Sequence, residues 1–295
     1  MNGDERSGLS IIVPVYNERG AVDDSIHRMT RIRESVDYDI EIIFVDDGST
    51  DGSEVILADQ SRNPFRVIRN VINRGYGAAL KRGIIAAKYD VVAITDADNT
   101  YPDERIPELY ERMSEGSLDM LVGARMGANV HIPWLRKPPK WALNQLANYL
   151  SGRKIPDLNS GLRLMKKEVV ERFLHVLPDS FSFTTTITLA LMTNGYSVEY
   201  IPIDYAHRSG SSKIRPIHDT LNFVQLICRT VMYFNPLRVF IPLSIVLALT
   251  AFAVLLLSWA FSRQIMDVTF GTLLVTSVNV LIVGLLADLI DKRLP

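Results

Sequence analysis

Two long apolar runs in the last quarter of the sequence constrain its fold more than any other feature. Residues 240–261 and 268–287 are almost free of charge, and each is near the roughly 20 residues with which a helix crosses the hydrocarbon core of a bilayer. Buried helices of soluble proteins rarely contain uninterrupted apolar runs of this length. The runs therefore predict two transmembrane helices within residues 237–295, joined as a tight hairpin whose outer ends lie on one side of the membrane.

Basic residues near the outer ends of this hairpin predict its orientation. They are Arg215, Arg229, Arg238, Lys292 and Arg293. The short connection between the runs contains one base, Arg263, and one acid, Asp267. Because Lys and Arg concentrate on the cytoplasmic side of a membrane, we expect an integral membrane protein with its N-terminal domain and its C-terminus in the cytoplasm. The segment between domain and hairpin, residues 216–236, mixes apolar residues with His218, Asp219 and Arg229, which predicts an interfacial amphipathic helix or, alternatively, a core helix.

The preceding residues, 1–215, alternate short apolar runs with stretches of helical periodicity. We expect strands at 9–13, 40–45, 66–68, 91–95 and 120–122, and helices at 21–33, 53–61, 77–88 and 104–114. Unbroken apolar strands belong to a sheet that is buried on both faces, and such sheets are mostly parallel. The predicted fold class is therefore α/β, in which ligands bind beyond the carboxyl ends of the strands.

Four of the predicted strands run into polar turns. These turns are PVYNE at 14–18, DDGSTD at 46–51, NRGYG at 73–77 and DAD at 96–98. Because the carboxyl ends of parallel strands meet at one edge of a sheet, the turns are expected to lie close together. Three of them contain carboxylates, which indicates a ligand with hydroxyl groups and with a charge that a cation neutralises.

The pair Asp96 and Asp98 allows more than one interpretation. An Asx turn after a strand is the plainest. A calcium-binding EF-hand loop also begins D-x-D, but Tyr101 and Pro107 occupy the positions where that loop needs Gly and Glu. Two hard oxygen ligands at a strand end instead suit Mg²⁺ or Mn²⁺ whose coordination is completed by phosphate oxygens of a ligand.

The other turns also have structural and functional interpretations. Asp46 and Asp47 either form a turn or accept hydrogen bonds from a base or ribose. Gly75 and Gly77 either ease the entry into a helix or let backbone N–H groups approach a phosphate, with Lys81 one turn further on. The first strand lacks the glycine fingerprint of dinucleotide folds, which argues against a dehydrogenase, and the net charge of −1 gives no support for a nucleic-acid partner.

Taken in order, VPVYNE, VDDGSTDGS, NRGYGAAL and DADNTYP resemble the signatures of family 2 glycosyltransferases, specifically the dolichol-phosphate mannosyltransferase-like polyprenyl-phosphate glycosyltransferases. The resemblance continues through VGAR at 122–125, DLNSGLR at 157–163 and HRSGSSK at 207–213. It implies an A-type glycosyltransferase fold with a Rossmann-like, mostly parallel sheet. It also implies a GDP- or UDP-linked sugar donor, a divalent metal, and inverting transfer of one hexosyl group to a dolichyl or undecaprenyl phosphate.

Functional residues follow from the resemblance by position. The nucleotide-sugar pocket would comprise Pro14, Tyr16, Glu18, Asp46, Asp47, Gly75, Gly77, Lys81 and Asp96. Asp96 and Asp98 would hold the metal and the donor diphosphate, although family members often have Gln as a further ligand where this chain has Thr100. The acceptor phosphate would meet Arg125, Arg163, Arg208, Ser212 and Lys213. The residues expected to take part in catalysis are Asp98, Arg125, Arg208 and Lys213.

The chemistry of transfer to a lipid phosphate fits this set of side chains. The nucleophile is already an anion, so no strong base is required, and the main difficulty is repulsion between two phosphorylated substrates. A metal and guanidinium groups offset that repulsion and stabilise the departing nucleoside diphosphate. The alternative for the basic segment 208–215 is ordinary membrane-surface charge.

Three rival functions remain open at this stage. A related transferase would use another lipid or a protein acceptor. A processive polysaccharide synthase is less expected, because the sequence contains no Q-x-x-R-W motif and two spans are few for an export channel. A catalytically silent membrane scaffold would keep the fold without turnover. The sequence identifies neither the sugar nor the base of the nucleotide, and it leaves open a homo-oligomer formed through the apolar helices.

Overall fold

The computed structural model describes residues 8–126, 145, 148–149, 152–205, 235–262 and 267–291. The predicted interfacial segment, apart from residues 235 and 236, and the basic residues of 207–213 lie outside these ranges. The elements are, in order, β1 (Leu9–Val15), α1 (Val22–Glu34), β2 (Ile40–Asp46), α2 (Ser53–Ala58), β3 (Arg66–Arg69), α3 (Tyr76–Ala86), β4 (Val91–Ile94), η1 (Asp103–Arg105), α4 (Ile106–Glu115), β5 (Met120–Arg125), β6 (Arg163–Lys166), α6 (Lys167–Phe173), α7 (Phe183–Thr193), β7 (Val198–Ile203), α9 (Leu237–Leu257), the π-helical turn η3 (Ser258–Ser262) and α10 (Asp267–Asp291).

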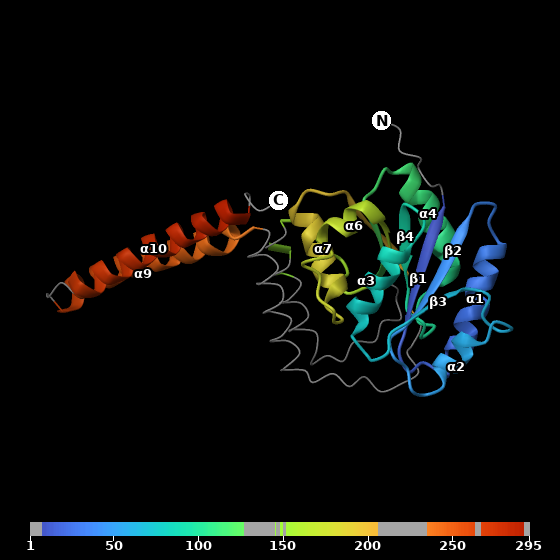
Figure 1. The fold of residues 1–295 in the computed structure, drawn as a ribbon. Helices are drawn as coiled ribbons and strands as arrows, with labels where there is room; N and C mark the ends of the chain where they lie inside the picture. The colour runs from blue at the N-terminus through green and yellow to red at the C-terminus, as the bar shows by residue number, and fades with distance from the viewer. Residues whose placement is uncertain are drawn as a thin grey trace.

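The sheet has seven strands in the order β3-β2-β1-β4-β6-β5-β7 (Figure 1). The pairs β1 with β2, β1 with β4, β2 with β3 and β5 with β7 are parallel. Strand β6 alone runs antiparallel to both of its neighbours, β4 and β5. The predicted mostly parallel sheet is confirmed, and the five predicted strands correspond to β1 to β5.

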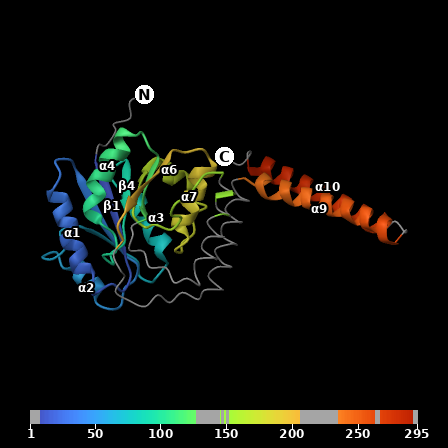
Figure 2. The same cartoon turned by 180° about the vertical axis from the view of Figure 1, so that it is seen from behind.

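Helices cover both faces of the sheet, which explains why strands such as β1 and β4 consist mainly of buried apolar residues. On β1, Ile11 and Ile12 point to opposite faces and belong to different core clusters. The first cluster includes side chains from α1 and α4, and the second includes side chains from α3, α6 and α7. Figure 2 shows the two helical layers from behind. The carboxyl edge of the sheet stays uncovered by these layers and holds the site described below.

Helices α9 and α10 pack along each other as a hairpin that projects from the α/β domain (Figures 1 and 2). Inside the hairpin the hydroxyl oxygens of Ser244 and Ser277 lie 3.2 Å apart, and Gly284 leaves room for the ring of Phe240. The two helices are long and apolar enough to cross a membrane, with mean hydropathies of 2.7 and 2.3. Only 11% of each apolar window is buried within the protein, so most of this apolar surface faces outward, as a bilayer requires.

Candidate active site

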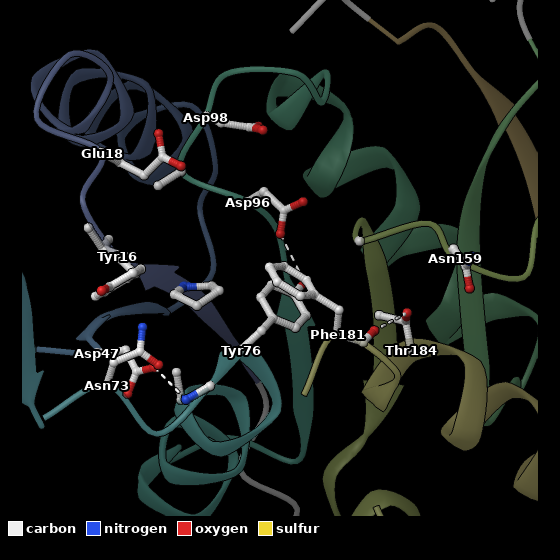
Figure 3. Close-up of a pocket in the computed structure, with 16 residues that line it drawn as sticks. Tyr16, Glu18, Asp47, Asn73, Tyr76, Asp96, Asp98, Asn159, Phe181 and Thr184 are labelled. Atoms are coloured by element: carbon white, nitrogen blue, oxygen red, sulfur yellow. Dashed lines mark hydrogen bonds between the residues drawn. The ribbon is translucent and has the colours of Figure 1, made fainter. Parts of the chain in front are cut away.

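A cavity of about 460 Å³ lies at the carboxyl edge of the sheet (Figure 3). Its lining residues are Pro14, Val15, Tyr16, Glu18, Asp47, Asn73, Gly75, Tyr76, Ala79, Asp96, Ala97, Asp98, Asn159, Gly161, Phe181 and Thr184. Residues from all four predicted turns are among them, so the prediction that these turns converge on one pocket is confirmed.

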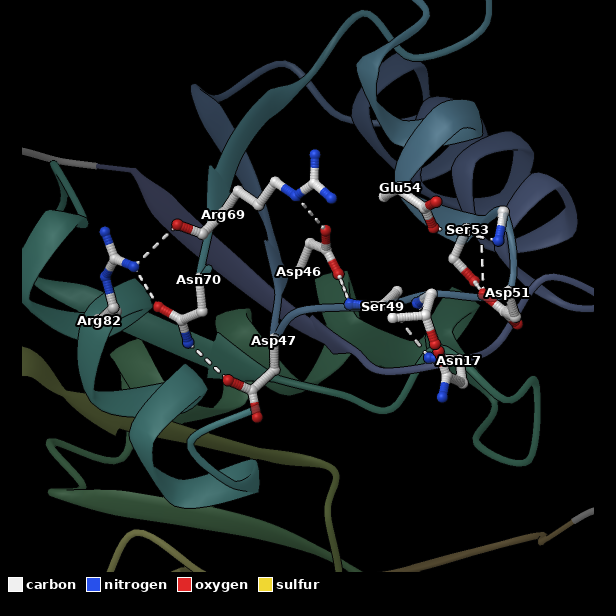
Figure 4. Close-up of polar contacts among 12 residues, drawn as sticks. Asn17, Asp46, Asp47, Ser49, Asp51, Ser53, Glu54, Arg69, Asn70 and Arg82 are labelled. Carbon is white, nitrogen blue, oxygen red and sulfur yellow. Dashed lines mark hydrogen bonds and ion pairs between the residues drawn. The ribbon is translucent and has the colours of Figure 1, made fainter. Parts of the chain in front are cut away.

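Asp47 is a carboxylate of the pocket wall that the protein holds by several hydrogen bonds (Figure 4). It accepts hydrogen bonds from the Asn70 side chain at 2.6 Å and from the backbone N–H groups of Arg74 and Gly75 at 3.0 and 2.7 Å. The side chain is only 2% exposed, so its orientation is fixed before any ligand binds. The Arg74 N–H also lies 3.2 Å from the second carboxylate oxygen, so the protein's own donors contact both oxygens of Asp47.

Asp46 differs from its neighbour because it does not line the pocket. Its carboxylate accepts the Ser49 N–H at 2.9 Å and lies 3.3 Å from the Arg69 guanidinium (Figure 4). This arrangement stabilises the turn after β2, which is the structural alternative that the sequence left open.

Asp96 belongs to the opposite part of the pocket wall and is oriented by Tyr76. The Tyr76 hydroxyl donates a 2.9 Å hydrogen bond to Asp96, and the Tyr76 ring stacks on Phe181 with centroids 5.3 Å apart (Figure 3). Burial, and then the charge of Asp96, raise the pKa of Tyr76 well above its usual value. The phenol therefore stays protonated and continues to donate to Asp96.

Asp98 lies on the same wall, in a turn in which Asn99 adopts a left-handed backbone conformation with φ of 63°. The Thr100 hydroxyl donates to Asp98 at 2.7 Å. In this turn Thr100 therefore holds the carboxylate of Asp98, at the position where the resemblance leads one to expect a further metal ligand.

The donor set fits a divalent metal that relies on its substrate for coordination. Asp96 and Asp98 provide hard carboxylate oxygens on one pocket wall, which suit Mg²⁺ or Mn²⁺. Among the described residues there is no group of three or more His, Cys, Asp or Glu side chains that could hold a metal. A metal bound by this pair would need further oxygens from elsewhere, and a diphosphate could supply them.

Gly75 lines the pocket as predicted, but the backbone N–H groups of Gly75 and Gly77 and the side chain of Lys81 are engaged by protein groups rather than directed at a phosphate. The Gly75 N–H donates to Asp47, and the Gly77 N–H donates to the Asp179 carbonyl at 2.9 Å. Lys81 forms an ion pair with the Asp179 carboxylate at 2.7 Å. A Cβ atom on Gly77 would lie 2.1 Å from the Pro178 carbonyl oxygen. These glycines therefore allow the loop before α7 to approach α3.

Arg163 likewise does not reach the pocket. Its side chain is 0% exposed and donates to the carbonyl groups of Ser160 and Thr184 and to the Thr188 hydroxyl. The predicted contact with an acceptor phosphate is inconsistent with this position, because the guanidinium has no accessible surface. Arg163 instead ties β6 to α7.

Arg125, at the end of β5, forms a two-point ion pair with Asp157. Its Nε and one terminal nitrogen lie 2.7 and 2.9 Å from the two carboxylate oxygens, and its guanidinium lies over the Tyr205 ring. Burial opposes the charge of Arg125, but the hydrogen bonds to Asp157 outweigh it and raise the pKa of Arg125. Arg125 is therefore held next to Tyr205. Tyr205 precedes Arg208 in the sequence by three residues. Arg208, Ser212 and Lys213 themselves lie outside the described residues.

Several pocket residues were not singled out from the sequence. They include Asn73, Tyr76, Asn159, Gly161, Phe181 and Thr184. Tyr76 stands between the two glycines of NRGYG, and Asn159 and Gly161 belong to DLNSGLR, so these segments offered a signal. Phe181 and Thr184 had none, because only the tertiary contact between the loop before α7 and α3 brings them to the pocket.

Comparison with known proteins places this geometry in a family. The family model described as Glycosyl transferase family 2 matches residues 10–174, more than half of the chain. Undecaprenyl-phosphate 4-deoxy-4-formamido-L-arabinose transferase of Enterobacter sp. (strain 638) is 31% identical over 209 residues, which are 70% of this chain and 62% of that protein. The chain thus spans less than two thirds of the length of this relative.

Solved structures of glucosyl-3-phosphoglycerate synthase from Mycobacterium tuberculosis have a similar fold. The complex with Mn²⁺, UDP and phosphoglyceric acid gives a TM-score of 0.55 at 21% identity, over 76% of this chain and 78% of that one. The complex with Mg²⁺ and UDP gives 0.54 at 20% identity, over 76% and 79%. The structural similarity establishes the A-type glycosyltransferase fold, and the family match establishes that the chain belongs to glycosyl transferase family 2.

Proposed function

We propose that this protein transfers a single hexosyl group from a nucleotide sugar to a polyprenyl phosphate at a membrane surface, with inversion at the anomeric carbon. The main supporting observation is one pocket that combines Asp47 with Asp96 and Asp98, in a family 2 chain that also contains an apolar helical hairpin. The relative from Enterobacter, whose name includes undecaprenyl phosphate, supports the choice of acceptor.

The donor would extend across the pocket from Asp47 to Asp98. Pro14, Tyr16 and Asp47 would contact the nucleoside, because Tyr16 offers a half-exposed ring and Asp47 a fixed acceptor. Asp96 and Asp98 would hold the Mg²⁺ or Mn²⁺, which offsets the negative charge of the donor diphosphate when bound. Tyr76 would keep Asp96 in the orientation that this contact needs.

In the transfer step an oxygen of the lipid phosphate would attack the anomeric carbon while the bond from that carbon to the diphosphate oxygen breaks. Attack from the face opposite the leaving group accounts for inversion. The attacking oxygen has no proton to lose, so no general base is required. Arg125 would support the binding region for the acceptor phosphate from its pair with Asp157, and Arg208, Ser212 and Lys213 remain its proposed direct contacts.

The proposed domain arrangement follows from this reaction. Residues 1–215 would form the catalytic domain, 216–236 an interfacial segment and 237–295 the membrane anchor. The bases near the outer hairpin ends favour a cytoplasmic position for the domain and the C-terminus.

The test is transfer of radiolabelled sugar from UDP- and GDP-linked donors into organic-extractable lipid, with purified protein, polyprenyl phosphate, and either Mn²⁺ or EDTA. Asp98→Asn is the key variant, because Asn keeps an oxygen to accept from Thr100 but loses the charge. Asp24→Asn, at an exposed site on α1, is the matched control. Labelled lipid that requires both the metal and Asp98 supports the proposal. Donor binding without labelled lipid from any donor would contradict the acceptor assignment and favour the scaffold or another acceptor.

A further inference from the structure

Helix α7 connects the pocket with the base of the hairpin. Thr184, in its first turn, lines the pocket, whereas Leu189 and Met192 pack in one cluster with Val239 of α9. At 1.5 Å per residue, Thr184 and Met192 lie about 12 Å apart along the helix axis. Figure 1 shows α7 on the side of the domain from which the hairpin projects.

Arg238, in the first turn of α9, makes a second contact with the domain. One guanidinium nitrogen donates a 2.9 Å hydrogen bond to the Tyr149 carbonyl. The guanidinium also lies against Gly152, where a Cβ atom would be 2.4 Å from it. Gly152 has a φ of +72°, a conformation that glycine adopts without strain. The Tyr149 carbonyl and the open side of Gly152 therefore receive this side chain together.

The segment that receives Arg238 continues directly into the pocket. The Gly152 N–H donates to the Asn148 carbonyl, and the Ile155 N–H donates to the Asn148 side chain, both at 2.8 Å. Ile155 and Leu158 belong to the cluster that contacts Val239. The next residue, Asn159, lines the pocket, and Asp157 holds Arg125. Two short paths, α7 and residues 152–159, thus run from the hairpin base to the site.

We infer that Arg238 is a positioning residue, which docks the membrane hairpin onto the α/β domain and so holds the pocket at a fixed place relative to the bilayer. This inference rests on the proposed lipid acceptor. A phosphate on a membrane-bound chain is confined to the bilayer surface, so the domain must present its pocket there. An undocked domain would sample many orientations, and the effective concentration of acceptor at the pocket would fall.

Full-length protein in lipid vesicles tests this role, with the sugar donor that labels lipid and two acceptors. One acceptor is a long polyprenyl phosphate in the bilayer, and the other is a water-soluble phosphate with two isoprene units. The variants are Arg238→Met, which removes the guanidinium, Arg238→Lys, which keeps one donor, and Gly152→Ala. Gly195→Ala is the matched control, because Gly195 also has a positive φ (+80°) but has no atoms near its Cβ position.

Arg238→Met and Gly152→Ala are expected to lower kcat/KM for the bilayer acceptor about tenfold, because a smaller fraction of the domains is docked and able to meet the acceptor. Transfer to the soluble acceptor should stay within about twofold, since the pocket itself is intact. Arg238→Lys should recover part of the loss, and Gly195→Ala should leave the ratio of the two acceptors unchanged. Equal losses on both acceptors, or no loss on either, would overturn the inference while leaving the proposed function standing.

A measurement that does not depend on transfer separates the two proposals if the wild type labels neither acceptor. Hydrogen exchange at the Gly152 and Ile155 amides should quicken in Arg238→Met if that side chain holds the segment, and unchanged exchange would overturn the docking role. Thermal unfolding of each variant shows whether the α/β domain remains folded.

Discussion

The Tyr76 hydroxyl and the Asp96 carboxylate are joined by a 2.9 Å hydrogen bond inside the pocket wall. The Tyr76 ring stacks on Phe181 on the pocket side, so one residue both orients an acidic side chain and forms part of the cavity surface. A phenylalanine at this position would keep the ring and lose only the hydroxyl. The two roles can therefore be separated by a single substitution.

Tyr76→Phe is expected to lower kcat/KM for transfer about tenfold or more, because a hydrogen bond to a charged group contributes about 1.5–3 kcal/mol. The concentration of Mn²⁺ required for half-maximal rate should rise as well, since Asp96 loses the donor that orients it. Tyr110→Phe, on α4 away from the pocket, is the control. An unchanged metal dependence in Tyr76→Phe would contradict the role assigned to the Tyr76 hydroxyl.

Gly77→Ala is expected to destabilise the protein by about 1–3 kcal/mol, as overpacking does in other interiors. Alanine usually stabilises a helix relative to glycine, whereas here we expect the substitution to lower the free energy of unfolding. The reason is the Pro178 carbonyl oxygen, 2.1 Å from the position of the new Cβ atom. Denaturant unfolding measures the change. Gly20→Ala, where no atom lies within 4 Å, is the control, and equal effects in the two variants would refute the packing role of Gly77.

Arg163→Lys distinguishes a structural role from a phosphate-binding one. Lysine keeps the charge but cannot reach the carbonyl groups of Ser160 and Thr184 together, so unfolding should become easier by at least about 2 kcal/mol. The folded enzyme should keep the wild-type KM for the acceptor. A raised acceptor KM without loss of stability would instead restore the predicted phosphate contact. Arg172→Lys, at an exposed site on α6, is the control.

The sequence predicted β1 to β5 and the convergence of four turns because both depend on local patterns. Apolar runs that are buried on both faces identify strands, and the parallel order brings their carboxyl ends together. The partner of each polar group was not predictable in the same way. Asp46 contacts Arg69 at the end of β3, and Asp47 contacts Asn70, the residue after it. These partners are close to the two aspartates only in the folded sheet, so the sequence did not show which aspartate faces the pocket.

The region from Arg163 to Ile203 illustrates the limit more sharply. Strand β6 has four residues, runs antiparallel and lies between β4 and β5, which no spacing in the sequence indicates. Arginine is a residue type that often binds phosphates, but Arg163 is buried by long-range contacts with Thr184 and Thr188 on α7. The sequence therefore predicted a ligand contact for Arg163, whereas its guanidinium forms hydrogen bonds inside the protein.

Asp103, just before α4, is a buried acid outside the pocket. Its side chain is 0% exposed, accepts a hydrogen bond from the Thr95 hydroxyl and lies 3.0 Å from Arg28. Burial raises the pKa of Asp103 to about 6, because it outweighs the opposing effects of Arg28 and Thr95. Arg28 links Asp103 to the turn that contains Asp98, because the Arg28 guanidinium also donates a hydrogen bond to the Asn99 side chain.

This raised pKa predicts how stability depends on pH. Between about pH 4 and pH 6 the folded protein keeps the Asp103 proton and the unfolded chain does not, so folding is favoured toward the acid side. The contribution is complete below the unfolded pKa of 3.8 and is lost as the pH rises through about 6. Across that window it amounts to about 3 kcal/mol, at about 1.4 kcal/mol for each unit of pKa.

Denaturant unfolding at a series of pH values measures this effect. The free energy of unfolding of the wild type, relative to that of Asp103→Asn, should rise as the pH falls from 7 to 4, because Asn does not titrate. Asp37→Asn, at an exposed site, should follow the wild type throughout. A constant difference between Asp103→Asn and wild type from pH 4 to pH 7 would mean that Asp103 is ionised in the folded protein over the whole range.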